Sequence, residues 1–277
     1  MSVAAGHGVF VYEPERAVAA FGSPAGVAVA MRTMGMGHAW LRVHGRDGAW
    51  RSAANAGLAA ALRADGIAIG VWGWCDGNDV ARDIANAVAA IDAHAPDAYI
   101  ADIEPGVRGA RWTAADAVRF AGAVKARLGA RPLVVSGPGL PGPAAAETMA
   151  AMDGIVDAFA PQAYWFDGPE PATAAAAQLP ADDPVAFVRL CLRRWRSVVT
   201  RPLIVTGQAW WGEADGWTQQ AAEARLAAFL AGFDDYAGIA GLNWWNLAAP
   251  DAMSARMRDL IAAARLDRRF PQAASTR

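Results

Sequence analysis

Short apolar runs alternate with helix-like segments along nearly the whole sequence, and this alternation limits the possible folds most. The apolar runs, eight in number, cover residues 8–12, 38–44, 67–74, 97–104, 132–136, 156–164, 202–210 and 238–245. The helix-like segments that follow them cover residues 24–34, 53–65, 78–94, 113–128, 144–152, 184–198, 218–232 and 254–265. Strict alternation of strand and helix implies a parallel sheet.

Eight strand–helix repeats in a chain of 277 residues suit a closed (β/α)8 barrel, the TIM barrel of the α/β class. The alternative is an open, doubly wound sheet. No Gly-x-Gly-x-x-Gly follows the first apolar run, so the dinucleotide-binding version of that sheet lacks its fingerprint. We expect one barrel over residues 1–266 and a flexible C-terminal tail over residues 267–277.

Composition argues against several function classes. The net charge is −2 and the isoelectric point is near 6.1, so the chain lacks the electrostatic footprint of a nucleic-acid-binding protein. The two cysteines, Cys75 and Cys191, form no C-x-x-C pair, and His38 and His44 have no metal-ligand spacing to other His or Cys residues. Ser136 has no Gly-x-Ser-x-Gly elbow around it. We therefore expect no metal, no cofactor and no serine hydrolase.

The N-terminal residues contain no basic region followed by an apolar one, and no stretch of about 18 apolar residues occurs. These features predict a soluble protein without a signal peptide or membrane insertion, cytoplasmic as synthesised. Delivery to a cell wall would then use a non-Sec route, or the protein would be phage-encoded. We expect a monomer.

The run from Asp97 to Glu104 carries two acids on one face of a strand. Side chains alternate between faces, so Ile100, Asp102 and Glu104 point the same way. The Cα atoms of the two acids lie roughly 6.5–7 Å apart, close enough to flank one reacting group. Burying unpaired carboxylates is costly, so a core strand with two acids needs a reason. The alternative is an acidic strand end that faces solvent and caps the next helix.

The barrel model brings chemically distinctive residues together, because catalytic groups of such barrels lie at the carboxyl ends of the strands. The residues expected at this end are Tyr12, Arg42, His44, Trp72, Trp74, Asp102, Glu104, Ser136, Gln162, Tyr164, Gln208, Trp210, Asn243 and Trp245. Trp72 and Trp74 are equally explained as packing inside the barrel. Trp210 and Trp211 cannot both face the interior. Asp157 stands too early in its strand for catalysis, which leaves Asp76 and Glu213 as reserve acids.

The combination of carboxyl groups and aromatic rings indicates sugar chemistry. Tryptophan rings pack against the C–H faces of sugars, while polar groups bind the hydroxyls. Glycosidic bonds are cleaved by carboxyl groups, one of which delivers a proton. We expect burial and the charge of Asp102 to raise the pKa of Glu104, and Arg42 or hydrogen bonds to keep Asp102 ionised.

The chain resembles the glycoside hydrolase barrels of the chitinase type (family 18) and the lysozyme type (family 25). Family 18 ends its fourth strand in Asp-Gly-x-Asp-x-Asp-x-Glu. Asp97, Asp102 and Glu104 match this pattern, whereas Ala98 and Ile100 depart from it.

Further matches lie on two later strands. The family 18 pattern Met-x-Tyr-Asp is matched here only by Tyr164, and Gly-x-Met-x-Trp is matched by Gly241 and Trp245 with Asn243 in place of Met. The Asp-x-Glu pair also resembles family 25, whose first-strand Asp is replaced by Tyr12 and Glu13.

The resemblance implies hydrolysis assisted by the N-acetyl group of the substrate. Glu104 would be the general acid and then the general base, and Asp102 would orient and stabilise the acetamido group. Tyr164 would hydrogen-bond that group, and Trp245 would form the floor. The other expected substrate-binding residues are Tyr12, Arg42, Trp72, Trp74, Gln162, Gln208, Trp210 and Asn243. The expected partner is a polysaccharide containing N-acetylhexosamine, with peptidoglycan favoured over chitin.

Two rival functions remain open. A catalytically inactive glycosidase-like barrel would bind carbohydrate or serve as a structural module, and the departures at Ile100 and Tyr12 motivate this reading. A barrel enzyme acting on a small metabolite would carry a phosphate-binding loop after the seventh or eighth strand, where this chain has tryptophans.

Overall fold

The computed structural model describes residues 6–46, 48–49, 53–165, 183–211, 218–248 and 252–270. Its strands are β1 (Gly6–Val11), β2 (His38–Gly45), β3 (Gly48–Ala49), β4 (Ala68–Cys75), β5 (Ala98–Ile103), β6 (Leu133–Pro138), β7 (Ala158–Ala163), β8 (Ile204–Gln208) and β9 (Gly241–Trp245). Its α-helices are α1 (Pro14–Ala20), α2 (Pro24–Thr33), α3 (Ala53–Ala64), α4 (Val80–His94), α5 (Ala114–Leu128), α6 (Pro143–Met152), α8 (Pro184–Arg196), α9 (Gln219–Gly232) and α10 (Ala255–Ala263). The 3₁₀ helices are η1 (Val107–Gly109), η3 (Asp235–Gly238) and η4 (Leu266–Arg268).

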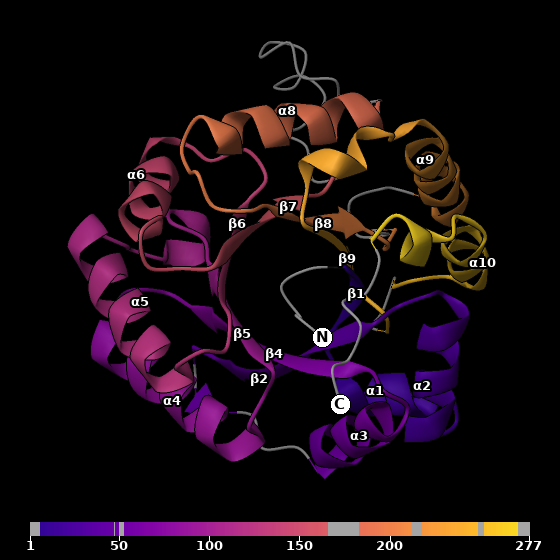
Figure 1. Cartoon of the computed structure of the whole chain (residues 1–277), viewed down its shortest axis with the longest axis horizontal. Helices are drawn as coiled ribbons and strands as arrows, with labels where there is room; N and C mark the ends of the chain where they lie inside the picture. Colours follow the sequence, from indigo (N-terminus) through magenta and orange to yellow (C-terminus); the bar gives the residue numbers. More distant parts are fainter. Residues whose placement is uncertain are drawn as a thin grey trace.

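The strands close into a barrel, as the alternation predicts. Neighbouring strands pair in parallel in the order β1, β2, β4, β5, β6, β7, β8 and β9, and β9 returns to β1. Viewed down its axis, the ring of strands is surrounded by a ring of helices (Figure 1). Only β3 is antiparallel, as a short extension beside the end of β2. The fold class is a single α/β (β/α)8 barrel.

Local sequence signals begin several helices. Asp79, Thr113, Asp183 and Thr218 each accept a hydrogen bond from a backbone amide in the first turn of α4, α5, α8 and α9 respectively. Such caps satisfy amides that have no partner within the helix. Outside the barrel, the apolar faces of these helices cover the outward side of the strands, where Leu41, Val71 and Phe159 are fully or almost fully buried.

The barrel interior holds its own apolar cluster, separate from the apolar layer between the strands and the helices. Large rings lie on one side of it and small or branched side chains on the other. Its fully buried members are Phe10, Trp40, Trp72, Ala98, Ile100, Val134, Ala158, Ala160 and Ile204. The ring of Trp40 occupies the space in front of Gly70, where an added Cβ would lie 2.1 Å from the indole. A glycine at position 70 is therefore required for Trp40 to fill the interior.

The structure adds elements that the sequence patterns did not predict, namely α1 and β3. The expected flexible tail begins at residue 267, but residues 267 and 268 belong to η4 and Phe270 is buried. Residues 271–277 lie outside the described part of the chain. Among the described residues, no helix has the length and apolar character needed to cross a membrane.

Candidate active site

The two acids of β5 lie at the carboxyl end of the barrel, as predicted. Asp102 is the register partner of Trp74 on β4 and of Ser136 on β6. Asp102 is only 8% exposed, whereas Glu104, just after the end of β5, is partly exposed. The two carboxyl groups therefore share one end of the barrel, and Glu104 is the more accessible of the pair.

Gln162 of β7 joins these acids into one polar cluster. Its Nε2 donates to Asp102 Oδ1 at 2.7 Å, to Glu104 Oε1 at 2.8 Å and to Ser136 Oγ at 3.1 Å. Since one amide nitrogen has two hydrogens, it shares them among three acceptors. Ser136 was among the residues expected at this end of the barrel, although no role was predicted for it. The sign in the sequence was a hydroxyl side chain at the end of an otherwise apolar run.

Burial raises the pKa of Asp102 well above its usual range. The negative charge of Glu104 and a hydrogen bond with its carboxyl group add to this rise, whereas the Ser136 hydroxyl and the charge of Arg42 oppose it. Desolvation at this depth opposes ionisation of Asp102 more strongly than the nearby cation favours it. Asp102 is therefore the acid of the pair whose protonated form burial favours.

An aromatic cluster stands on the β1, β4 and β9 side of the interior. The rings of Tyr12, Trp72 and Trp245 lie within 5.3–6.1 Å of one another, measured between centroids. Trp72 is 2% exposed, while Tyr12 and Trp245 are partly exposed. The guanidinium carbon of Arg42 lies 4.4 Å from the centroid of Tyr12. Tyr12 and Trp245 can present rings to a ligand, and Trp72 supports them from below.

Two residues expected at the strand ends lie deeper than predicted. Asn243 is fully buried, and its Oδ1 is 2.6 Å from Nε2 of His38. Gln208 is 1% exposed. Asn243 occupies the middle of the five-residue strand β9, whereas Gln208 is the last residue of β8. Both side chains are buried rather than on an accessible surface.

A β-bulge changes the face on which His44 lies. The register of β2 against β4 shifts between Arg42 and His44, so these two residues no longer share a face. His44 instead stacks on Tyr99, with its Nε2 2.6 Å from the phenol oxygen, in the layer between sheet and helices. The sequence prediction that placed His44 at the candidate site is wrong.

Tyr164 and Trp210 follow the neighbouring strands β7 and β8. Both are partly exposed, and their rings make an edge-to-face contact at 6.3 Å. Trp74 is also partly exposed and lies under the guanidinium group of Arg46, 5.0 Å from its carbon. Tyr164, Trp210 and Trp74 therefore remain accessible for contact with a ligand.

The reserve acids have other roles or lie outside the described residues. Asp157 accepts a hydrogen bond from Lys125 at 2.7 Å at the foot of β7. Asp76 is ion-paired with Arg46 at 2.9 Å and with Arg82 at 3.0 Å. Glu213 lies outside the described part of the chain.

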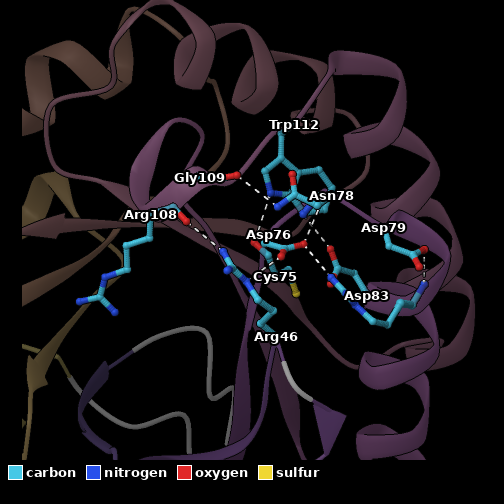
Figure 2. A network of polar contacts seen from close by, with 11 residues as sticks. Arg46, Cys75, Asp76, Asn78, Asp79, Asp83, Arg108, Gly109 and Trp112 are labelled. Carbon is cyan, nitrogen blue, oxygen red and sulfur yellow. Dashed lines mark hydrogen bonds and ion pairs between the residues drawn. The ribbon is translucent and has the colours of Figure 1, made fainter.

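Asp76 is the centre of a polar network that ties three loops together (Figure 2). Burial pushes the pKa of Asp76 upward, but hydrogen bonds from Asn78 and the charges of Arg82 and Arg46 together hold it below its usual value. This arrangement keeps Asp76 ionised and bound to its partners. Asp76 therefore stabilises the loops rather than taking part in the reaction.

No group of three or more His, Cys, Asp or Glu side chains that could hold a metal ion occurs within the described ranges.

Comparisons with known proteins agree with the fold. No protein-family model and no curated protein matches the sequence. Among solved structures, a GH5_18 protein from Bifidobacterium longum subsp. infantis superposes with a TM-score of 0.67 at 12% identity, over 97% of this chain and 80% of that one. A chitinase from Bacteroides thetaiotaomicron gives 0.65 at 10% identity, over 99% and 98% of the two chains. An endo-1,4-beta-mannanase from Rhizomucor miehei gives 0.61 at 11% identity, over 94% of each chain. This chain therefore has the barrel fold that these glycoside hydrolases share.

Proposed function

We propose that the chain is a glycoside hydrolase that cleaves a polysaccharide containing N-acetylhexosamine. The observation that carries this proposal is the Asp102–Glu104 carboxyl pair, bridged by Gln162 at the carboxyl end of the barrel. The partly exposed rings of Tyr12 and Trp245 nearby suit the apolar faces of a sugar. The chitinase and the mannanase of similar fold are consistent with this assignment.

In the proposed mechanism, Glu104 donates a proton to the glycosidic oxygen as the bond to C1 breaks. The acetamido oxygen of the same sugar attacks C1, and Asp102 accepts a hydrogen bond from the acetamido N–H. The carboxyl pair enters the reaction with one proton, which lies on Glu104 when Asp102 accepts the hydrogen bond from the acetamido N–H. Glu104 then removes a proton from water, which attacks C1 and releases the sugar, so one water is consumed per bond.

The substrate we favour is peptidoglycan ahead of chitin. Tyr164 would hydrogen-bond the acetamido group, and Gln162 would keep the two carboxyl groups oriented toward it. The proposal is tested by measuring release of reducing ends from purified cell wall and from chitin oligomers. Glu104→Gln should remove this activity, whereas Glu147→Gln, the same change on the exposed side of α6, should preserve it.

A second candidate is a non-catalytic barrel that binds carbohydrate. It is favoured by Ile100, which is fully buried inside the barrel where family 18 carries a third acid. This candidate predicts that wild type binds N-acetylhexosamine oligomers without releasing reducing ends from any of them. Hydrolysis that depends on Glu104 excludes it.

A further inference from the structure

We propose that Arg108 binds a carboxylate of the substrate, so that the preferred glycan is an acidic polymer rather than a neutral one. This inference rests on the proposed function, because it names the substrate class of the same site. Arg108 belongs to the loop that follows Glu104, and that loop starts as a turn in which the Val107 amide donates to the Glu104 carbonyl at 3.0 Å. Its side chain is thus four residues from the proposed general acid.

The backbone of Arg108 is in a conformation that a residue with a Cβ rarely adopts. Its φ is 50° and its ψ is 32°, in the left-handed region. Gly106, with φ 87°, and Gly109, with φ 78°, supply the other turns of this loop without strain. Glycine would also be the favoured residue at position 108, yet the chain has arginine there. Backbone strain of this kind concentrates at functional sites, where the role of the residue offsets its energetic cost.

The Asp76 network holds this strained loop from below. Arg46 donates to the Arg108 carbonyl at 2.9 Å, and Asn78 donates to the Gly109 carbonyl at 3.1 Å. The Arg111 amide donates to the Asp76 carbonyl at 2.8 Å. Contacts from the loops after β2 and β4 therefore hold the backbone from the carbonyl group of Arg108 to Arg111 (Figure 2).

The side chain of Arg108 points away from this network, while its carbonyl group points into it (Figure 2). It is exposed, and among the described residues its guanidinium group has neither a hydrogen bond nor an ion pair. The neighbouring cation Arg46 already neutralises Asp76, and Arg42 stacks on Tyr12. The loop that follows the proposed general acid thus presents the exposed guanidinium group of Arg108.

A guanidinium group binds carboxylates through paired, charge-assisted hydrogen bonds. Two kinds of N-acetylhexosamine polymer carry carboxylates: those with a lactyl ether, as in N-acetylmuramic acid, and those with a uronic acid. Chitin carries none. The shared chemistry is a carboxylated glycan.

The test measures affinity by calorimetry on the Glu104→Gln protein, so that cleavage does not consume the ligand. The three ligands are peptide-free strands of alternating N-acetylglucosamine and N-acetylmuramic acid, oligomers of alternating glucuronate and N-acetylglucosamine, and neutral N-acetylglucosamine oligomers of equal length. We expect one acidic ligand to bind about tenfold more tightly than the neutral one, as one charge-assisted contact allows. Adding Arg108→Gln to the Glu104→Gln protein should remove the difference in affinity between the acidic and the neutral ligand.

Arg111→Gln is the matched control, since it removes an exposed arginine from the same loop. It should leave the preference intact. Arg108→Gly, which suits the left-handed backbone, guards against misfolding and should lose the preference as Arg108→Gln does. A preference that survives both Arg108 variants, equal affinity for all three ligands, or binding of none overturns the inference.

Wild-type kinetics separate this inference from the proposed function. Hydrolysis with equal KM for acidic and neutral glycans would contradict the role of Arg108 and leave the hydrolase intact. An Arg108-dependent preference without any hydrolysis by wild type would contradict the hydrolase and support acidic recognition.

Discussion

At the residue scale, Asp102 shows how depth decides the chemistry of a carboxyl group. Asp102 and Glu104 are two positions apart in one strand segment, yet Asp102 is 8% exposed and Glu104 is partly exposed. Desolvation therefore raises the pKa of Asp102 most, and the charge of Glu104 adds to it. The two acids consequently have different surroundings, with Glu104 the more accessible and Asp102 in a site that favours its protonated form.

This depth has a consequence for stability. Because the folded state keeps the proton on Asp102 above pH 3.8, where the unfolded chain releases it, stability falls as the pH rises toward the raised pKa. Asp102→Asn removes the titrating group and with it this pH-dependent loss of stability. The free energy of unfolding of the variant should therefore rise relative to that of wild type as the pH rises, by about 1.4 kcal/mol for each pKa unit of the shift. Urea denaturation at pH 5 and pH 8 measures it, and a gain that shrinks with pH would contradict the burial argument.

Arg108 gives a second prediction for a single residue. Its left-handed backbone costs roughly 1 kcal/mol for a residue with a Cβ, and glycine avoids this cost. We expect Arg108→Gly to raise the free energy of unfolding by about that amount. Ala95→Gly is a matched comparison, since Ala95 ends α4 with φ 40°. A loss of stability in both variants would rule out strain as the explanation.

At the element scale, the loops after β2, β4 and β5 form one unit through Asp76. The two arginine partners of Asp76 have side chains that are 43% and 39% exposed, while the Asp76 side chain is 2% exposed. The carboxylate is thus the buried hub, and the cations reach it from the surface. The loop that carries Glu104 and Arg108 depends on this hub for its shape.

Asp76→Asn should therefore destabilise the fold by about 1–3 kcal/mol, the range for removing a charged hydrogen-bond partner from a buried site. Because the pKa of Asp76 is lowered, its contribution is present above pH 3.8 and is lost as the pH falls through the folded value. The deficit of the variant should accordingly shrink as the pH falls below 3.8. Asp79→Asn, the same change at the cap of α4, should cost almost nothing because Asn caps helices equally well.

The elements themselves were largely predictable, because alternation between apolar runs and amphipathic segments is a local signal. The β-bulge in β2 was not, since it depends on how β2 pairs with β4, and it moved His44 to the outer face. The depth of Asn243 was missed for a related reason. The sequence shows that a strand ends near Trp245. It does not show how the stagger between neighbouring strands sets the depth of each side chain inside the barrel.

At the scale of the whole molecule, three buried histidines make the fold sensitive to acid. Burial lowers the pKa of His7 to about 3, of His38 to about 4 and of His44 to about 4. His7 accepts a hydrogen bond from Trp244 Nε1 at 2.7 Å, and this requires a neutral ring. The unfolded chain protonates its histidines near pH 6.5, so acid favours unfolding from that pH downward.

The free energy of unfolding should therefore fall between pH 6.5 and pH 4, with each histidine contributing about 1.4 kcal/mol per pH unit. The opposite effect of Asp102 reduces the total slope. His38→Gln should flatten the dependence by the share of one histidine, as measured by urea denaturation across this range. An unchanged slope in that variant would show that His38 is not neutral in the folded state.

The site as a whole was predictable in outline, because the carboxyl ends of parallel strands meet at one end of a barrel. Asp102, Glu104 and Gln162 were placed together from strand order alone. The rise in the pKa of Asp102 was not predictable, since it depends mainly on the depth of the side chain. The left-handed backbone of Arg108 was not predicted. Only the glycines at positions 106 and 109 indicate a positive φ in this part of the sequence.

The central claim is that Glu104 cleaves a glycosidic bond with help from Asp102. Its most direct test is the rate at which purified wild type and Glu104→Gln release reducing ends from an N-acetylhexosamine polymer. The account predicts that wild type is active and that kcat falls by about 10²–10⁴ in the variant, the usual contribution of general acid–base catalysis. Equal rates for the two proteins would contradict it.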